Sequence, residues 1–167
     1  PNKKQYLLNY YLEQFRSTVF RQTMFAEFEK LIHARSEEGE ALTPELLSGL
    51  YHQLNVDYYG PEIVVDPEID WEWARIPHFY SSFYVYKYAT GFSAAVSLSE
   101  QILQEGDPAE ARYLNFLKSG GLGYPLDQLK QAGVDLSTPR PVQEGLKLFA
   151  SLLGQMEELA GLKSESV

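Results

Sequence analysis

Apolar residues recur along most of the chain at intervals of three and four positions, which is typical of helices. Residues 3–35 contain no glycine or proline, and their apolar positions spread over more than one face, so they predict one long helix that is covered on several sides. The remaining pattern predicts further helices at residues 43–54, 71–76, 82–103, 107–119, 125–132 and 141–162, followed by a frayed end. The one strand-like run, residues 63–65, is short, so we predict an all-α fold with residues 1–167 forming a single helical region.

Local signals mark several of the predicted helix ends. Thr43 precedes a proline and is expected to cap its helix. Asp70 is expected to cap the short helix before Pro77, and residues 107–110 (DPAE) read as a capping box with Asp107 as the cap. Residues 119–123 (SGGLG) end a helix without the Lys-Ser/Thr of a phosphate-binding loop, so they predict a mobile turn.

The segment of residues 78–88 holds six aromatic rings and one histidine within eleven positions. If the helix begins near Ser82, then Tyr80, Tyr84 and Tyr88 share one face at four-residue spacing while Tyr86 turns away. Two interpretations are open. Aromatic rings at helical spacing usually form core, but tyrosines beside a histidine also suit a groove that holds a peptide and donates hydrogen bonds to an oxyanion.

Composition and charge narrow the function classes. The chain has no cysteine, which excludes disulfides and thiolate metal sites and is expected of a cytoplasmic protein. There is neither a basic patch nor an apolar run long enough to cross a bilayer, so we expect no nucleic acid and no membrane as partners. Residues 36–76 carry ten acidic side chains and one basic within a chain of net charge -9. Such a segment forms a solvated face or favours cationic peptides.

Isolated ionisable residues give little evidence of a metal site. His33, His52 and Glu27 each lack a second ligand at the spacing that metal binding requires. The two histidines are therefore expected to be surface or structural residues, and Glu27 is expected to pair with a neighbouring helix. The chain contains no H-E-x-x-H sequence.

Three stretches together resemble the C-terminal part of the oligoendopeptidase F family, which is similar to the thimet-oligopeptidase-like zinc peptidases. They are residues 15–29 (FRSTVFRQTMFAEFE), residues 74–80 (ARIPHFY) running on to Thr90-Gly91, and residues 124–126 (YPL) with 132–135 (AGVD). The likeness covers nearly the whole chain. It departs at the glycine turn, where the family tends to have a serine and an acid in place of Leu122 and Gly123.

The resemblance implies a zinc-dependent metalloendopeptidase that acts on short peptides inside a closed helical channel. Members bind zinc through H-E-x-x-H on one helix and a glutamate on the next, and the family's order places these ligands before Pro1. We therefore expect this chain to be the C-terminal part of a larger peptidase domain, with the remainder of the peptidase chain as its partner. Alone it is expected to bind no catalytic zinc and to cleave nothing.

The resemblance also assigns candidate site residues to the aromatic segment. It implies that His78 contacts the substrate or the oxyanion and that Tyr88 is the principal phenol donor, with Tyr84, Tyr86 and Tyr80 as substrate-binding candidates. The alternative is a non-catalytic helical module that binds a peptide or a partner helix through the same aromatic face.

Overall fold

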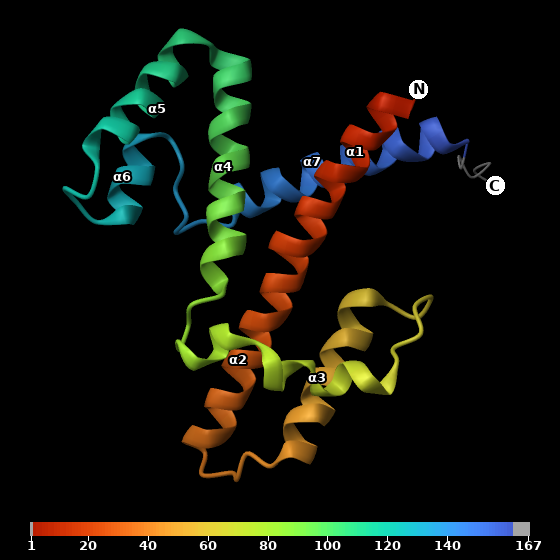
Figure 1. Cartoon of the computed structure of the whole chain (residues 1–167). Helices are drawn as coiled ribbons and strands as arrows, with labels where there is room; N and C mark the ends of the chain where they lie inside the picture. Colours follow the sequence, from red (N-terminus) through yellow and green to blue (C-terminus); the bar gives the residue numbers. More distant parts are fainter. Residues whose placement is uncertain (1, 162–167) are drawn as a thin grey trace. The chain divides into compact units, whose positions relative to one another are not determined.

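The computed structural model describes residues 2–161 and contains no β-strand within that range (Figure 1). The predicted all-α fold is therefore confirmed. The elements are α1 (Asn2–Gln14), the π-helix η1 (Phe15–Phe20), α2 (Arg21–Glu37), α3 (Pro44–Tyr59), the 3-10 helices η2 (Pro67–Arg75) and η3 (Pro77–Tyr80), α4 (Tyr86–Glu105), α5 (Asp107–Ser119), α6 (Pro125–Gln131) and α7 (Arg140–Ala160). The predicted helix end at Leu162 and the frayed segment after it lie outside the described residues.

The contacts divide the chain into two compact units, and the first contains residues 2–19 and 90–161. In this unit α1 packs against α7, and α5 packs against α6. Phe15 is fully buried and contacts the rings of Phe92 and Phe149, with centroids 4.8 and 5.5 Å away. A second cluster joins α4 to the α6–α7 connection through four buried residues, which are Ala94, Leu98, Ala132 and Val134.

The second unit contains residues 20–89 and carries the aromatic segment. Here α2 and α3 lie side by side, and α3 also packs against η2 (Figure 1). Thr43 caps α3 as predicted, because its hydroxyl accepts a hydrogen bond from the backbone N–H of Leu46 at 3.3 Å. The core between these helices consists of Met24, Phe25, Phe28, Tyr51, Leu54, Ile76 and Val85. Whether both units belong to one larger peptidase domain stays a prediction.

The helical stretch predicted at residues 3–35 exists, but it is not one regular α-helix. Its middle, η1, is a π-helix, in which each turn holds more residues than an α-helical turn. The hydroxyl of Ser17 donates a hydrogen bond to the carbonyl of Glu13 at 2.7 Å. That carbonyl is the acceptor that a regular α-helix pairs with the N–H of Ser17, so the side chain competes with the α-helical pattern at this point.

Two of the predicted caps are wrong. Helix α5 begins at Asp107 itself, after Gly106 with φ 70°, and no side chain caps it. The short helix before Pro77 is the 3-10 helix η2, which begins at Pro67 instead of after Asp70. In this structure Asp70 lies inside η2, and its carboxylate pairs with the Nδ1 atom of His52 at 2.8 Å.

The aromatic helix also starts later than predicted, at Tyr86 instead of Ser82. The cause is Phe83, which has φ 57° and lies in the left-handed region that a right-handed helix excludes. The predicted common face of Tyr80, Tyr84 and Tyr88 is therefore wrong. Tyr80 lies in η3, Tyr84 lies in the loop that follows, and Tyr88 lies in α4.

Candidate functional site

The aromatic segment is held in the second unit by buried apolar side chains at both ends. Ile76 comes directly before η3 and Val85 directly before α4, and they are 7% and 0% exposed. Between them, the ring of Phe79 packs against Phe25 and Phe28 of α2, with centroids 5.5 and 5.3 Å away. These contacts fix the two ends of the segment, so the residues between them take defined positions.

His78, Tyr84 and Tyr88 form one contiguous group of rings, which we call the His–Tyr cluster. The His78 imidazole stacks on the Tyr84 ring with centroids 5.5 Å apart and planes 7° apart. Tyr88 meets both rings edge-on, at 5.8 Å from His78 and 5.7 Å from Tyr84. The Nε2 atom of His78 and the hydroxyl of Tyr88 lie 3.4 Å apart. Three of the five predicted site residues are thus brought together.

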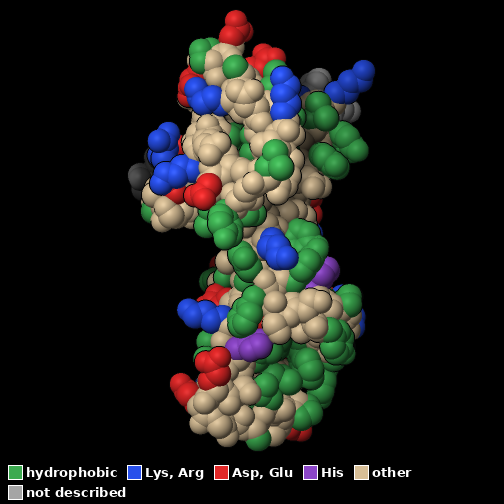
Figure 2. Space-filling view, turned by 90° about the vertical axis from the view of Figure 1, so that its left-hand side faces the viewer, with side chains coloured by type: hydrophobic (Ala, Val, Ile, Leu, Met, Phe, Trp, Pro, Cys, Tyr) green, Lys and Arg blue, Asp and Glu red, His purple; other side chains and the backbone are tan. Residues whose placement is uncertain are grey.

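The cluster is accessible and is not sealed in a core. Tyr84 is 38% exposed, and His78 and Tyr88 are half-buried. Figure 2 shows hydrophobic side chains at the surface beside the histidine side chains that are visible in this view. An exposed group of phenols and an imidazole can offer several hydrogen-bond donors to one acceptor.

A contact within the cluster keeps the Tyr88 phenol protonated. A hydrogen bond with Tyr84 is the main influence on the Tyr88 phenol, and it raises the pKa of Tyr88 above its usual value of 10.0. The ammonium of Lys87 lies 4.4 Å from the centre of the Tyr84 ring, where a cation is attracted to the face of the ring. At neutral pH Tyr88 therefore carries the proton that a hydrogen-bond donor needs.

The remaining two predicted residues lie outside the His–Tyr cluster. The side chain of Tyr80 is 86% exposed, and Tyr86, the first residue of α4, is 51% exposed. The reason is the loop at residues 81–85, which turns the chain between them and so breaks the four-residue spacing on which the grouping of Tyr80 depended.

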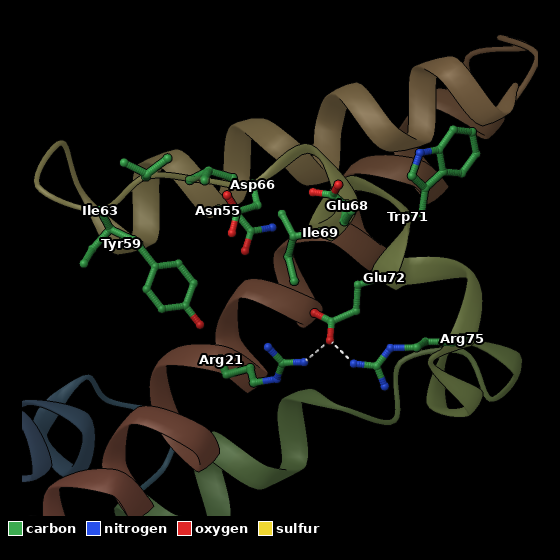
Figure 3. A pocket seen from close by; sticks show the side chains of 12 residues that line it. Arg21, Asn55, Tyr59, Ile63, Asp66, Glu68, Ile69, Trp71, Glu72 and Arg75 are labelled. Carbon is green, nitrogen blue, oxygen red and sulfur yellow. Dashed lines mark hydrogen bonds and ion pairs between the residues drawn. The ribbon is translucent and has the colours of Figure 1, made fainter.

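A buried carboxylate, Glu72 of η2, anchors the chain just ahead of His78. One oxygen of Glu72 accepts hydrogen bonds from Arg21, at 2.6 Å, and from Arg75 (Figure 3). The other oxygen accepts a hydrogen bond from the Tyr51 hydroxyl at 2.6 Å. Burial raises the pKa of Glu72, but the hydrogen bonds from Tyr51 and Arg21 and the attraction to both guanidinium groups outweigh burial and lower that pKa below its usual value. Glu72 therefore stays ionised and holds Arg75, three residues before His78.

A pocket of about 580 Å³ opens beside Glu72 (Figure 3). Its charged lining includes Arg21, Glu72 and Arg75, and its apolar lining includes Ile63 and Trp71, which are 55% and 56% exposed. The residues that line it do not include the predicted site residues. The pocket is therefore a feature separate from the His–Tyr cluster.

The other ionisable candidates have structural contacts. Glu27 accepts a hydrogen bond from the Tyr58 hydroxyl at 2.8 Å, and His33 lies against the Phe83 ring with centroids 4.6 Å apart. Within residues 2–161, no three histidine, cysteine, aspartate or glutamate side chains are grouped so that they could hold a metal ion. In the same range, no helix is both long and apolar enough to cross a membrane.

Sequence reasoning missed two buried glutamates of the second unit, Glu72 and Glu29. Glu29 is 2% exposed and lies on the α2 face that also buries Phe25 and Phe28. A charged residue at an apolar position of a helical pattern was a usable signal, because a buried carboxylate requires a partner. The sequence alone did not show which residue that partner is, because it lies far away in the sequence.

Comparison with known proteins shows which protein family this chain belongs to. The model of Peptidase family M3 matches residues 1–148 of this chain. The chain belongs to peptidase family M3.

Within the family, the similarity is to oligoendopeptidase F, as the sequence predicted. The chain is 58% identical over 157 residues to oligopeptidase PepF of Bacillus subtilis, covering 94% of this chain and 23% of that protein. It is 48% identical over 153 residues to the chromosomal oligoendopeptidase F of Lactococcus lactis, covering 92% and 25%. The crystal structure of oligoendopeptidase-F from Enterococcus faecium superposes with a TM-score of 0.94 at 46% identity, covering 98% of this chain and 31% of that one. The chain thus spans about a quarter of the length of the curated relatives it matches.

Proposed function

We propose that this chain is part of a zinc-dependent metalloendopeptidase that hydrolyses short peptides, and that its His–Tyr cluster forms the substrate-binding wall opposite the metal. The relatives named above as an oligopeptidase and an oligoendopeptidase support the general activity. One geometric observation supports the specific role, which is that His78, Tyr84 and Tyr88 converge at an accessible surface with ring centroids 5.5 to 5.8 Å apart.

The chemistry of the cluster follows from its donors. Peptide hydrolysis adds water to a carbonyl carbon, and the carbonyl oxygen then carries negative charge in the tetrahedral intermediate. The Tyr88 hydroxyl and the His78 imidazole, 3.4 Å apart, are close enough to donate to one such oxygen. Hydrogen bonds to that oxygen strengthen as charge develops, so the donors lower the barrier more than they tighten substrate binding.

The described residues do not provide a binding site for the zinc ion. Residues 2–161 offer no group of three ligands, so in this proposal other residues of the full enzyme bind the zinc. In the proposed reaction, the residues of this chain donate hydrogen bonds to the substrate or orient it.

The test is a pair of substitutions in the full-length enzyme, Tyr88→Phe and His78→Ala. Each removes one donor to the developing oxyanion, so we expect kcat to fall about 100- to 1000-fold while KM changes little. The measurement is steady-state hydrolysis of an internally quenched peptide. Tyr124→Phe removes a hydroxyl from a tyrosine of the first unit and serves as the matched control, with kcat expected to be unchanged.

The same variants separate the proposal from the alternative of a peptide-binding module. If both substitutions weaken peptide binding and leave kcat unaltered, the cluster binds peptide without stabilising the oxyanion. Unaltered kcat and KM in both variants would remove His78 and Tyr88 from the site. Tyr84→Phe and Tyr86→Phe then show whether either of the other phenols takes the role.

A further inference from the structure

The loop that carries Tyr84 has a backbone conformation that its own sequence does not favour. Phe83 has φ 57°, and among the described residues it is the one non-glycine residue with positive φ. A bulky side chain is disfavoured in this left-handed region, because its Cβ atom crowds the backbone. Some contact from outside the loop must therefore stabilise this conformation.

The contact comes from Glu29, which lies 54 residues earlier in the chain on α2. The backbone N–H of Phe83 donates a hydrogen bond to the Glu29 carboxylate, with the nitrogen and oxygen 2.6 Å apart. Glu29 is 2% exposed, so this hydrogen bond is shielded from solvent. The contact also provides the buried carboxylate with a donor.

A second residue of α2 holds the side chain of the same phenylalanine. His33 lies one helical turn after Glu29, and its ring lies over the Phe83 ring with centroids 4.6 Å apart and planes 35° apart. Backbone and side chain of Phe83 are thus both fixed by α2. The residue that follows is Tyr84, which stacks on His78.

We infer that Glu29 is a positioning residue for the His–Tyr cluster, acting through the Phe83 N–H to hold Tyr84 stacked on His78. Without this acceptor the left-handed conformation of Phe83 loses its hydrogen bond, and the backbone relaxes to the negative φ that phenylalanine prefers. That rotation redirects the chain at Tyr84 and separates the two stacked rings. The kinetic consequence of the inference rests on the proposed function, but the structural consequence does not.

The test compares Glu29→Gln with Glu29→Leu in the full-length enzyme. Glutamine keeps a side-chain oxygen that accepts from Phe83, whereas leucine keeps similar bulk and has no acceptor. The structural readout is the imidazole proton resonance of His78 in enzyme with 13C-labelled histidine, which the stacked Tyr84 ring shifts and which His78→Gln identifies by its loss. Tyr84→Ala gives the position of this resonance in the unstacked state.

We expect Glu29→Gln to leave the His78 resonance near its wild-type position and Glu29→Leu to move it toward the Tyr84→Ala position. We also expect kcat to fall about 10- to 100-fold in Glu29→Leu, because small displacements of catalytic groups are costly, and to be largely restored in Glu29→Gln. Glu27→Leu is the matched control, since Glu27 lies on the same helix and binds Tyr58 instead of the loop.

The two readouts fail independently. If the His78 resonance does not move in Glu29→Leu, the positioning role is overturned, whatever the kinetics show. If the resonance moves as expected and kcat does not change, Glu29 does position the cluster, and the proposed role of the cluster in hydrolysis is wrong.

Discussion

At the scale of single residues, the main consequence of the structure concerns the protonation of Tyr88. Its phenol donates to substrate only while protonated, and its contact with Tyr84 raises its pKa above 10.0. Donation is therefore retained below this raised pKa and lost as the pH rises through it. In the proposed enzyme, deprotonation of Tyr88 should therefore cause no loss of activity between neutral pH and about pH 10.

This leads to a prediction about a modified tyrosine. Fluorination of the Tyr88 ring lowers the phenol pKa without changing the shape of the side chain much, so the alkaline fall in kcat should move to lower pH. The measurement is the pH profile of kcat for enzyme that carries difluorotyrosine at position 88. An alkaline limb that stays at its wild-type position would mean that the Tyr88 proton is not needed.

At the scale of helices and loops, the capping residue Thr43 gives a testable prediction for the stability of the first turn of α3. The Thr43 hydroxyl binds the Leu46 N–H, which has no partner within the helix. Thr43→Ala removes this acceptor and should destabilise the first turn by about 1 kcal/mol. Hydrogen exchange of the Leu46 amide should become faster in Thr43→Ala and stay close to the wild-type rate in Thr43→Ser, which keeps a hydroxyl. Equal exchange rates in all three proteins would contradict the assigned cap.

The same scale shows what the sequence could and could not predict. Helix α3 starts at Thr43-Pro44 and helix α6 at Tyr124-Pro125. Both starts are set by adjacent residues, and both were predicted correctly. The start of α4 was predicted wrongly, because Phe83 has a left-handed conformation and its N–H donates a hydrogen bond to Glu29, which lies 54 positions away. Most of the candidate site was found because its residue types were known from the family resemblance. Their grouping could not be derived, since the loop and not helical spacing brings the rings together.

At the scale of the whole molecule, the chain carries only part of the machinery that the proposed reaction needs. It spans about a quarter of its curated relatives, and its described residues offer no metal site. We expect the 167-residue chain alone to retain no zinc and to cleave no peptide. The full enzyme is expected to contain about one zinc per chain, the usual content of a mononuclear catalytic site. Metal analysis by mass spectrometry and a peptide-cleavage assay on both proteins test this. Stoichiometric zinc on the shorter chain would contradict it.

The arrangement around Glu72 also determines which substitutions the second unit tolerates. Arg21 and Arg75 both bind the same oxygen of one buried carboxylate. Either arginine can therefore be replaced while the other still neutralises the charge, so each position is partly redundant. Glu72 has no such substitute, and its loss leaves two guanidinium groups and the Tyr51 hydroxyl without their shared acceptor. In a saturation mutagenesis library, position 72 should tolerate far fewer replacements than position 21 or 75.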